Sequence, residues 1–479
     1  MELALLIDFG STYTKVTAVD VEAAEVLATA RGITTVETNI LEGLEQAMEA
    51  IKPHFGGSLP EFRHRLACSS AAGGLRMVAI GLVKELTVEA ARQAVLGAGA
   101  RVLGVYAHQL TRAEIEQIDS SCPDIILLAG GTDGGNKETI LYNAGMLATA
   151  KCGKIVIIAG NKSAAEEVRE ILVRAGKDAM ITENVLPELN KLNVEHARTT
   201  IRNTFLNKIV EAKGLRRAES YIQGVLMPTP AAVMNAARLL AQGTEDEPGW
   251  GDLMMVDIGG ATTDVYSMSD GLPTKSGVTF KGLPEPFAKR TVEGDLGMRV
   301  SARSLLESVG ARKLAAQTGL AEEQVISYIH RVHDRVDEVP SGETQWTVDT
   351  AMAQMATELA VERHAGTMET LWTPMGAVHV QHGKDLTQVS CLIGTGGVLV
   401  NHPKPWKILM GALFKQNQPT ILRPQRPKMM LDKKYILAAV GLLAELKPTV
   451  ALRLAKKNLV EIGDQPKGSE AIATGQQKT

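Results

Sequence analysis

The chain has 479 residues, more than one compact core usually contains, so two or more domains are expected. Hydrophobic residues make up 45% of the sequence and charged residues 22%, and the formal net charge is −3, which is typical of a soluble globular protein. Charges of both signs are spread along the chain and form no basic stripe, which argues against a nucleic-acid partner.

Four cysteines lie far apart and form no C-x-x-C pair: Cys68, Cys122, Cys152 and Cys391. This spacing disfavours a zinc site, an iron–sulfur cluster and a disulfide framework, so reduced thiols are expected. Asp8 interrupts the first apolar run, which is therefore not a signal peptide. The longest apolar stretch, 435–444, is shorter than the ~17–25 residues that a membrane span needs. These features predict a cytoplasmic protein without a membrane partner.

The predicted elements begin with strands and then alternate with helices. Strands are predicted at 3–9, 12–20 and 26–33, a helix at 41–51 and a short strand at 66–70. Between about 76 and 195, helical patterns at 88–96, 112–118, 136–150 and 164–174 alternate with strand patterns at 102–106, 125–129, 155–159 and 179–182. Such alternation predicts a parallel, doubly wound sheet.

The second half of the chain repeats the opening pattern. Helices are predicted over 189–213 and 231–240, followed by a linker at 243–251 and a strand pair that begins at 253. Several helices and a strand at 389–393 come next. From Gly463 onward the sequence is polar and is predicted to be disordered.

Two hairpin turns share one pattern, in which an apolar strand ends at Asp8 or Asp257 and a glycine, hydroxyl residues and a second strand follow. Glycines in a tight turn let backbone N–H groups approach an anion, and Ser and Thr hydroxyls add donors. A carboxylate beside a phosphate makes sense where Mg²⁺ or a water lies between them. An ordinary turn uses the same residue types, but two copies in order favour a phosphate site.

Two further glycine-rich loops stand out. The turn at 394–397 follows an apolar strand, and its backbone could lie flat against a nucleoside, although alone it is weak evidence. The loop at 130–135 ends a predicted parallel strand, so it is either a second ligand or partner site or a βα loop that needs glycines. The sequence contains neither a P-loop pattern nor a G-x-G-x-x-G that opens a helix.

The three turns, in this order, resemble the phosphate-1, phosphate-2 and adenosine motifs of the actin, hexokinase and heat-shock ATPase superfamily. Segments 227–233 and 432–441 resemble its two connecting helices. The resemblance implies an α/β fold of two ribonuclease-H-like lobes that hold Mg-ATP in a cleft. For this chain it implies a first lobe at 1–247 with an extra α/β segment at about 76–195, a second lobe at 248–430, a connecting helix region at 431–460 and a disordered tail at 461–479.

The resemblance also assigns roles to single residues. Asp8 and Asp257 would organise Mg²⁺, mostly through water, and Asp257 would orient the attacking water. The nucleotide would be bound by residues of the three turns: Asp8, Gly10, Ser11, Thr12 and Lys15, then Gly259, Gly260, Thr262 and Thr263, then Gly394, Thr395, Gly396 and Gly397. A solvated strand lysine is an equally good interpretation of Lys15.

Within the superfamily the chain resembles the MutL/GlmL proteins, accessory factors of adenosylcobalamin-dependent glutamate mutase and related aminomutases. The similar stretches lie at 7–15, 128–135, 291–299 and 363–366. The resemblance implies an ATP-hydrolysing, chaperone-like reactivating factor that loosens the mutase so that a damaged cobalamin can leave. The sequence has no D-x-H-x-x-G, the signature of a base-off cobalamin domain, so this chain is expected to act on a protein that holds cobalamin.

Several alternatives stay open at this point. A small-molecule kinase of the sugar-kinase branch would need an Asp base, for which Asp133 is a candidate. An actin-like scaffolding ATPase is a further possibility. Segment 293–299 could open a helix whose N–H groups face the nucleotide or could be a plain helix start. His364 is more typical of a structural than of a catalytic histidine.

Overall fold

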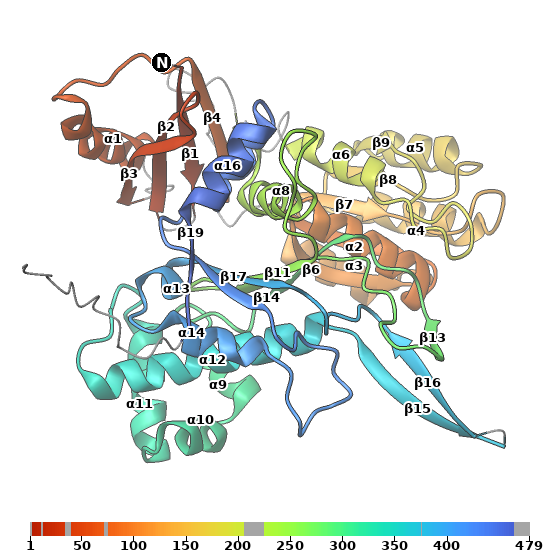
Figure 1. Cartoon of the computed structure of the whole chain (residues 1–479). Coiled ribbons are helices and arrows are strands. Elements are labelled where there is room, and N and C mark those ends of the chain that lie inside the picture. Colours follow the sequence, from red (N-terminus) through yellow and green to blue (C-terminus); the bar gives the residue numbers. More distant parts are fainter. Residues whose placement is uncertain are drawn as a thin grey trace, which may run out of the picture.

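Three large sheets organise the computed structural model, which describes residues 2–10, 13–33, 40–70, 75–205, 225–374 and 376–463. In Figure 1 the first sheet lies at the upper left, the second lies below it with most of the later helices, and the third lies at the right. The predicted tail begins at the end of the last strand, and its residues from 464 onward lie outside the described residues.

The first sheet has the strand order β10-β4-β1-β2-β3. Its strands are β1 (Leu3–Phe9), β2 (Tyr13–Asp20), β3 (Glu25–Ile33), β4 (His64–Ser69) and β10 (Val225–Pro228). Strands β1, β2 and β3 pair antiparallel, whereas β4 runs parallel to β1 and β10 parallel to β4. Strand β1 is buried along its whole length, as expected of a central apolar strand, and helix α1 (Ile40–Ile51) packs against β3.

The second sheet repeats this arrangement with the order β14-β12-β11-β17-β18-β19. Its strands are β11 (Leu253–Ile258), β12 (Thr263–Met268), β14 (Ala288–Glu293), β17 (Cys391–Thr395), β18 (Lys428–Asp432) and β19 (Leu459–Glu461). Again three strands are antiparallel and the next two are parallel to the central one. The predicted boundary between 430 and 431 falls inside β18.

The third sheet is inserted between β4 and β10 and is parallel throughout, with the order β6-β5-β7-β8-β9. Its strands are β5 (Arg76–Gly81), β6 (Arg101–Ala107), β7 (Ile125–Leu128), β8 (Ile155–Ile158) and β9 (Asp178–Ile181), and its helices are α2 (Glu89–Gly97), α3 (Arg112–Ser121), α4 (Glu138–Thr149) and α5 (Ala165–Arg174). The sequence pattern missed β5, which lies between β6 and β7. Helix α6 (Glu195–Thr204) occupies part of the predicted 189–213 helix, and 206–224 lie outside the described residues.

The expectation of four reduced cysteines is wrong for two of them. Cys122, which ends α3, is disulfide-bonded to Cys152, which precedes β8. The two are 30 residues apart in sequence, and the parallel pairing of β7 with β8 brings their segments together. Short-range spacing carries no signal for such a pair. Cys68 and Cys391 are free and buried.

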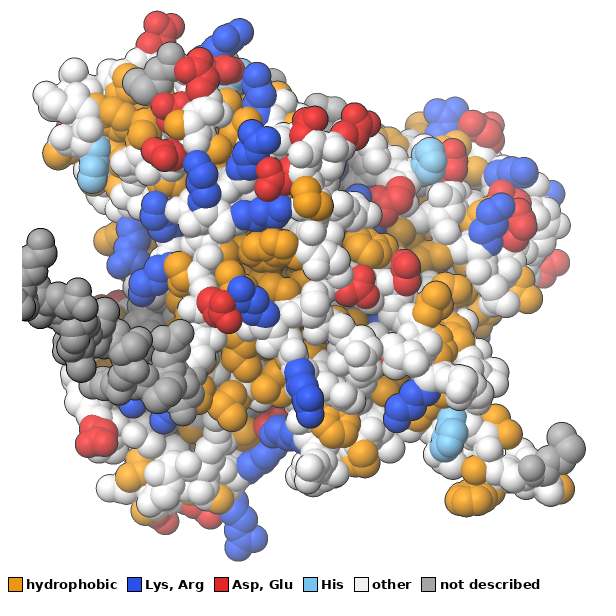
Figure 2. Space-filling view, in the orientation of Figure 1, with side chains coloured by type: hydrophobic (Ala, Val, Ile, Leu, Met, Phe, Trp, Pro, Cys, Tyr) orange, Lys and Arg blue, Asp and Glu red, His pale blue; other side chains and the backbone are white. Residues whose placement is uncertain are grey.

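The second sheet carries the helices α9 (Ala302–Val309), α10 (Ala311–Thr318), α11 (Glu322–Asp334), α12 (Glu343–His364), α13 (Gly397–Asn401) and α14 (Pro405–Leu409). A small sheet of β13 (Val278–Lys281), β16 (Gly376–His382) and β15 (Thr367–Thr373) was not predicted. Its hairpin projects from the body in Figure 1, and Figure 2 shows hydrophobic side chains there, among which Trp372 is 83% exposed.

Three helices join the two repeated sheets: α8 (Thr229–Gln242), α15 (Leu437–Ala444) and α16 (Pro448–Asn458). One hydrophobic core contains side chains of all three together with Leu6 of β1 and Met255 of β11. The connecting helix predicted at 432–441 begins later than expected, at Leu437, because β18 continues to Asp432 and a turn follows it. Among the described residues, no helix combines the length and the apolar character needed to cross a bilayer.

Gly441 marks the closest approach of α15 to α8. A Cβ added at Gly441 would lie 1.7 Å from the carbonyl oxygen of Ala232. We expect Gly441→Ala to lower the free energy of unfolding by about 3 kcal/mol or more, because backbone must move to relieve the clash. Gly145→Ala on α4 is the control, since nothing lies within 4 Å of its added Cβ, and it should stabilise by about 0.5–1 kcal/mol. Denaturant unfolding of both variants measures this, and equal effects would contradict it.

Candidate functional site

The two predicted phosphate turns share one backbone hydrogen bond. The amide of Gly10 donates to the carbonyl of Tyr13 at 3.1 Å, and that of Gly259 donates to the carbonyl of Thr262 at 2.9 Å. Both turns connect the two antiparallel strands that begin their sheet. Ser11 and Thr12, predicted to bind phosphate, lie outside the described residues.

The strand register gives the two turns different charge pairs. Asp8 on β1 pairs with Lys15 on β2, whereas the equivalent Asp257 on β11 pairs with Asp264 on β12. Residues directly opposite on antiparallel strands point to the same face of the sheet, where like charges repel. The second turn therefore has an unbalanced negative charge that the first does not have.

Asp8 is buried at the end of β1 and fully engaged. Its Oδ2 lies 2.7 Å from the Lys15 Nζ, and its Oδ1 accepts a hydrogen bond of 2.6 Å from the Thr229 hydroxyl at the start of α8. The Cys68 thiol also contacts Oδ1 at 3.6 Å. Lys15 Nζ lies 3.7 Å from the centroid of the Tyr435 ring, which belongs to the loop after β18. Lys15 thus links the first sheet to the second.

The pKa of Lys15 reflects this position. Burial alone would lower the pKa, but the Asp8 carboxylate raises it above its usual range, so the amine stays charged. Tyr435 was not predicted, yet its backbone has a φ of 56°, a left-handed conformation that non-glycine residues rarely adopt and that clusters at functional sites. The sequence gives no signal for this conformation at a tyrosine.

The Asp257 side chain is largely shielded from solvent, and its neighbours disfavour its negative charge. Burial and the facing Asp264 carboxylate raise the pKa of Asp257 to about 7. The charge of Lys15 opposes this rise, and the carboxylates of Asp432 and Asp8 add to it. A carboxylate that titrates near neutrality can accept a proton or bind a cation.

The adenosine turn lies against Asp257. A Cβ added at Gly396, whose φ is 93°, would be 2.5 Å from the Asp257 Oδ1. Only glycine allows this approach. Next to it, the Thr395 hydroxyl donates to Asp432 Oδ2 at 3.0 Å, and Asp432 also accepts from the amides of Ile436 and Leu437, so it caps α15. Asp432 was missed as a site residue, although a strand-ending Asp before an apolar helix is a capping signal.

Of the remaining residues predicted to bind nucleotide, some have free space around them and others already contact protein groups. Gly260 and Gly397 have space around them, since an added Cβ would meet nothing closer than 3.6 Å and nothing within 4 Å, respectively. Gly394 instead packs against Leu399 and Leu409. Two predicted hydroxyls are already bonded: Thr262 donates to Asp264 Oδ2 at 3.1 Å, and the buried Thr263 donates to the Leu296 carbonyl at 2.7 Å.

Segment 293–299 does not open a helix, because the next helix starts at Ala302. It packs on the phosphate-2 turn: the amides of Met298 and Arg299 donate to the carbonyls of Gly259 and Gly260 at 3.1 and 2.8 Å. A Cβ at Gly297 would lie 2.3 Å from the Ala261 backbone. These hydrogen bonds use carbonyls of the turn as acceptors.

Segment 363–366 lies beside segment 291–299. Arg363 forms ion pairs with Glu293 and Asp295 at 2.7 and 2.8 Å. His364 is bonded through both ring nitrogens, to Thr291 and to Ser267 at 2.9 and 2.8 Å.

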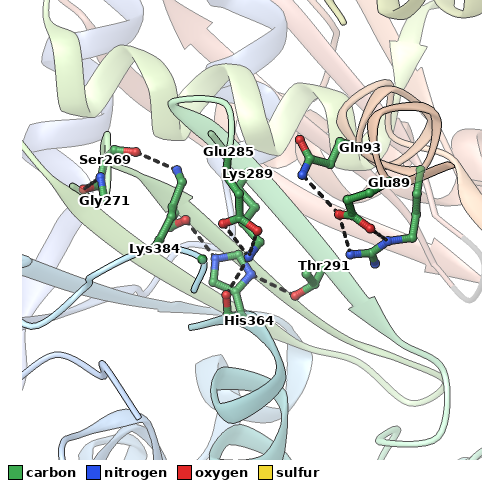
Figure 3. A network of polar contacts seen from close by, with 12 residues as sticks. Glu89, Gln93, Ser269, Gly271, Glu285, Lys289, Thr291, His364 and Lys384 are labelled. Atoms are coloured by element: carbon green, nitrogen blue, oxygen red, sulfur yellow. Dashed lines mark hydrogen bonds and ion pairs between the residues drawn. The ribbon is translucent and has the colours of Figure 1, made fainter. Parts of the chain in front are cut away.

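Figure 3 shows His364 beside Lys289, whose Nζ donates to the His364 carbonyl at 2.7 Å. Burial and the positive charges of Lys289 and Lys384 hold the pKa of His364 well below its usual range. A neutral histidine with both nitrogens engaged has a structural role, as expected.

The loop at 130–135 is held by side chains of neighbouring loops. Asn161 accepts from the Gly134 amide at 3.1 Å, and Asn184 donates to the Gly131 carbonyl at 3.0 Å. Asp133 Oδ1 accepts from the Lys162 amide and from Asn184, each at 3.0 Å. The loop lies where the strand order of the parallel sheet reverses, between β5 and β7. Its polar groups, however, form hydrogen bonds with neighbouring loops.

A pocket of about 230 Å³ lies beside the junction of the two repeated sheets. It is lined on one side by Lys15 and Arg31 of β2 and β3 and on the other by Asn401, Lys434 and Tyr435. Its three cationic side chains suit an anionic ligand.

The chemistry of the site fits Mg²⁺. Carboxylate oxygens are the hard ligands that this ion prefers, and burial together with the facing Asp264 carboxylate raises the pKa of Asp257. Among the described residues, no group of three His, Cys, Asp or Glu could hold a metal ion. Asp8 and Asp257 would be the residues to hold such an ion, mostly through water.

Two sheets of the same strand order, each beginning with a hairpin whose turn follows an Asp, define a two-lobed α/β fold of the actin-like ATPase class. The fold class predicted from the sequence is confirmed. The profile of the MutL protein family matches residues 4–459, and the chain belongs to this family. It is 55% identical over 462 residues to protein MutL of Clostridium tetanomorphum, covering 96% of this chain and 100% of that protein.

Solved structures are similar at a much lower level. A nucleotide-free acetone carboxylase is 15% identical, with a TM-score of 0.39, over 92% of this chain and 70% of that one. The activator of the 2-hydroxyisocaproyl-CoA dehydratase from Clostridium difficile, with bound ADPNP, is 10% identical, with a TM-score of 0.30, over 95% and 96%. The family assignment therefore rests on the sequence matches.

Asp257 should make the metal-free protein less stable at high pH. Because its pKa is raised to about 7 in the folded state, from about 3.9 in an unfolded chain, deprotonation disfavours the fold between these values, and the cost is fully present above pH 7. Asp257→Asn is therefore expected to raise the free energy of unfolding by about 1–3 kcal/mol at pH 8 and by much less at pH 4. Thermal unfolding without Mg²⁺ or nucleotide measures this, and a gain independent of pH would contradict it.

Proposed function

We propose that this chain binds Mg-ATP between its two lobes, hydrolyses it, and serves as a reactivating factor for an adenosylcobalamin-dependent mutase such as glutamate mutase. One observation carries the nucleotide part of the proposal. The two hairpin turns and the adenosine turn converge on Asp8, Asp257 and Lys15, with Gly396 against Asp257. In this arrangement Asp257 orients the attacking water, and Lys15 is released from Asp8 to pair with a phosphate when Mg²⁺ arrives.

The partner part of the proposal rests on the resemblance to the MutL/GlmL accessory factors and on membership of the MutL family. The kinase alternative is less well supported, because both oxygens of its candidate base lie near groups of its own loops. Asp133 Oδ1 accepts two hydrogen bonds and Oδ2 lies 3.9 Å from Lys162. No observation favours a scaffolding role.

ATP binding is expected to depend on Mg²⁺, because the cation must neutralise Asp8 and Asp257 before a phosphate can approach. Titration calorimetry with ATP, with and without Mg²⁺, measures this. Absence of binding in both conditions would remove the nucleotide proposal.

Asp257→Ala should lower the rate of ATP hydrolysis by about 10²–10³-fold, the usual cost of losing a key positioning group. Asp270→Ala is the matched control, since Asp270 is exposed beyond the other end of the same hairpin, and it should leave the rate within about twofold. A steady-state phosphate-release assay gives both values. If the Asp257 variant turns over normally, another group orients the water.

A cognate adenosylcobalamin mutase should bind this protein with different affinities in ATP, in ADP and without nucleotide, because a partner that binds all states equally cannot be changed by them. Mutase carrying a damaged cobalamin should regain activity with this protein, ATP, Mg²⁺ and fresh cofactor. A non-hydrolysable ATP analogue should support at most one round of exchange. Equal recovery without this protein would overturn the partner proposal and leave the nucleotide proposal standing.

A further inference from the structure

The inserted α/β unit is docked on the second lobe through helix α2 and strand β14. Figure 3 shows Glu89 and Gln93 of α2 beside Thr291 and Lys289 of β14. The helix ends close to α8 as well, because a Cβ added at Gly99, whose φ is 84°, would lie 2.9 Å from the Ala231 amide. This interface contains two buried arginines, and they differ in what else they contact.

Arg290 on β14 spans the interface and the phosphate-2 hairpin. Its Nη1 donates to the carbonyls of Leu96 and Ala100, at 3.2 and 3.1 Å, and thereby caps the C-terminal end of α2. Its Nε and Nη2 lie 3.0 and 2.7 Å from Asp264 Oδ1. The side chain is only 4% exposed, so these contacts are shielded from water.

Arg198 on α6 is buried in the same interface but does not reach the hairpin. Its Nη2 lies 3.5 Å from the Gln93 carbonyl and 3.4 Å from the Ala288 carbonyl, and its Nη1 pairs with Glu195 at 2.5 Å. It therefore joins α2 to β14 without touching Asp264.

We propose that Arg290 is a positioning residue that fixes Asp264, and through it Asp257, and that couples both to the C-terminal end of α2 in the inserted unit. This inference rests on the proposed nucleotide site and assigns it a structural connection to the insertion. Asp264 faces Asp257 across the strand pair, so Arg290 is the counter-ion that allows two carboxylates to face each other. A buried carboxylate without its counter-ion would be strongly unfavourable.

The charges explain how a bound nucleotide would affect the end of α2. When Mg-nucleotide neutralises Asp257, the repulsion between Asp257 and Asp264 falls. The Asp264 carboxylate can then shift relative to the Arg290 guanidinium. Since the same guanidinium holds the last carbonyls of α2, a shift at Asp264 changes the hydrogen bonds at the helix end. The amides of α2 should therefore exchange with solvent at a different rate when nucleotide is bound.

Two substitutions separate the roles of the guanidinium. Arg290→Lys keeps a positive charge that can pair with Asp264, but a single ammonium group cannot also reproduce the contact with the carbonyls of Leu96, in α2, and Ala100, just beyond it. Arg290→Gln removes the charge as well. Arg198→Lys and Arg198→Gln are the matched controls, because they weaken the same interface without touching the hairpin.

The test combines ATPase kinetics with hydrogen exchange on the full chain, after calorimetry has established Mg-ATP binding and thermal unfolding has established that each variant is folded. We expect Mg-ATP to change the exchange of the α2 amides at least about threefold in the unsubstituted protein and in Arg198→Lys, but not in Arg290→Lys. Arg290→Gln should lower kcat by about 10–100-fold with KM for ATP within about threefold, whereas Arg198→Gln should leave both within about threefold.

The outcomes that overturn the inference are distinct from those that overturn the proposed function. If Mg-ATP does not bind, both fall. If it binds and the α2 amides of the unsubstituted protein do not respond, the inference alone is overturned. If Arg290→Lys and Arg198→Lys lose the hydrogen-exchange response of α2 to Mg-ATP equally, the interface has only a structural role. Should Arg290→Gln fail to fold, Arg290→Lys still decides the question through hydrogen exchange.

Discussion

The repulsion between Asp257 and Asp264 is the constraint around which the site is arranged. The two carboxylates face each other on neighbouring strands, a placement that costs free energy unless positive charge is supplied. Arg290 supplies it from the outer strand at 2.7 Å, and Lys15 supplies some from the other lobe. The pKa of Asp257 nevertheless rises to about 7. Burial is the largest cause of this rise and the Asp264 carboxylate the next, and a bound cation would favour the charged form of Asp257.

Two of the segments that resemble the family outside the turns, 291–299 and 363–366, support this arrangement. Segment 291–299 binds the carbonyls of the phosphate-2 turn, and segment 363–366 holds it through Arg363 and through His364, which is bonded to Thr291. A turn held this firmly keeps its N–H groups aimed in one direction without help from a ligand. These residues thus fix the backbone of the turn.

Local sequence patterns predicted those parts of the site that are formed by residues close together in the chain. The hairpins at Asp8 and Asp257, and the glycine turn at Gly396, were predicted because strand, turn and glycine signals occur within a few residues. Tyr435, Arg290 and the disulfide between Cys122 and Cys152 were not, because each depends on contacts between segments far apart in the chain. The small sheet of β13, β15 and β16 was missed for the same reason, since β13 pairs with β16 from a distant part of the chain, and β15 is exposed along most of its length.

The insertion of the parallel sheet between β4 and β10 has a mechanical consequence. The insertion is covalently part of the first lobe, yet its helix α2 packs on β14 of the second lobe through buried arginines. A change in the angle between the lobes must therefore either break these charged hydrogen bonds, at about 1.5–3 kcal/mol each, or move the insertion with the second lobe. The insertion is thus tied to both lobes, covalently to the first and through buried hydrogen bonds to the second.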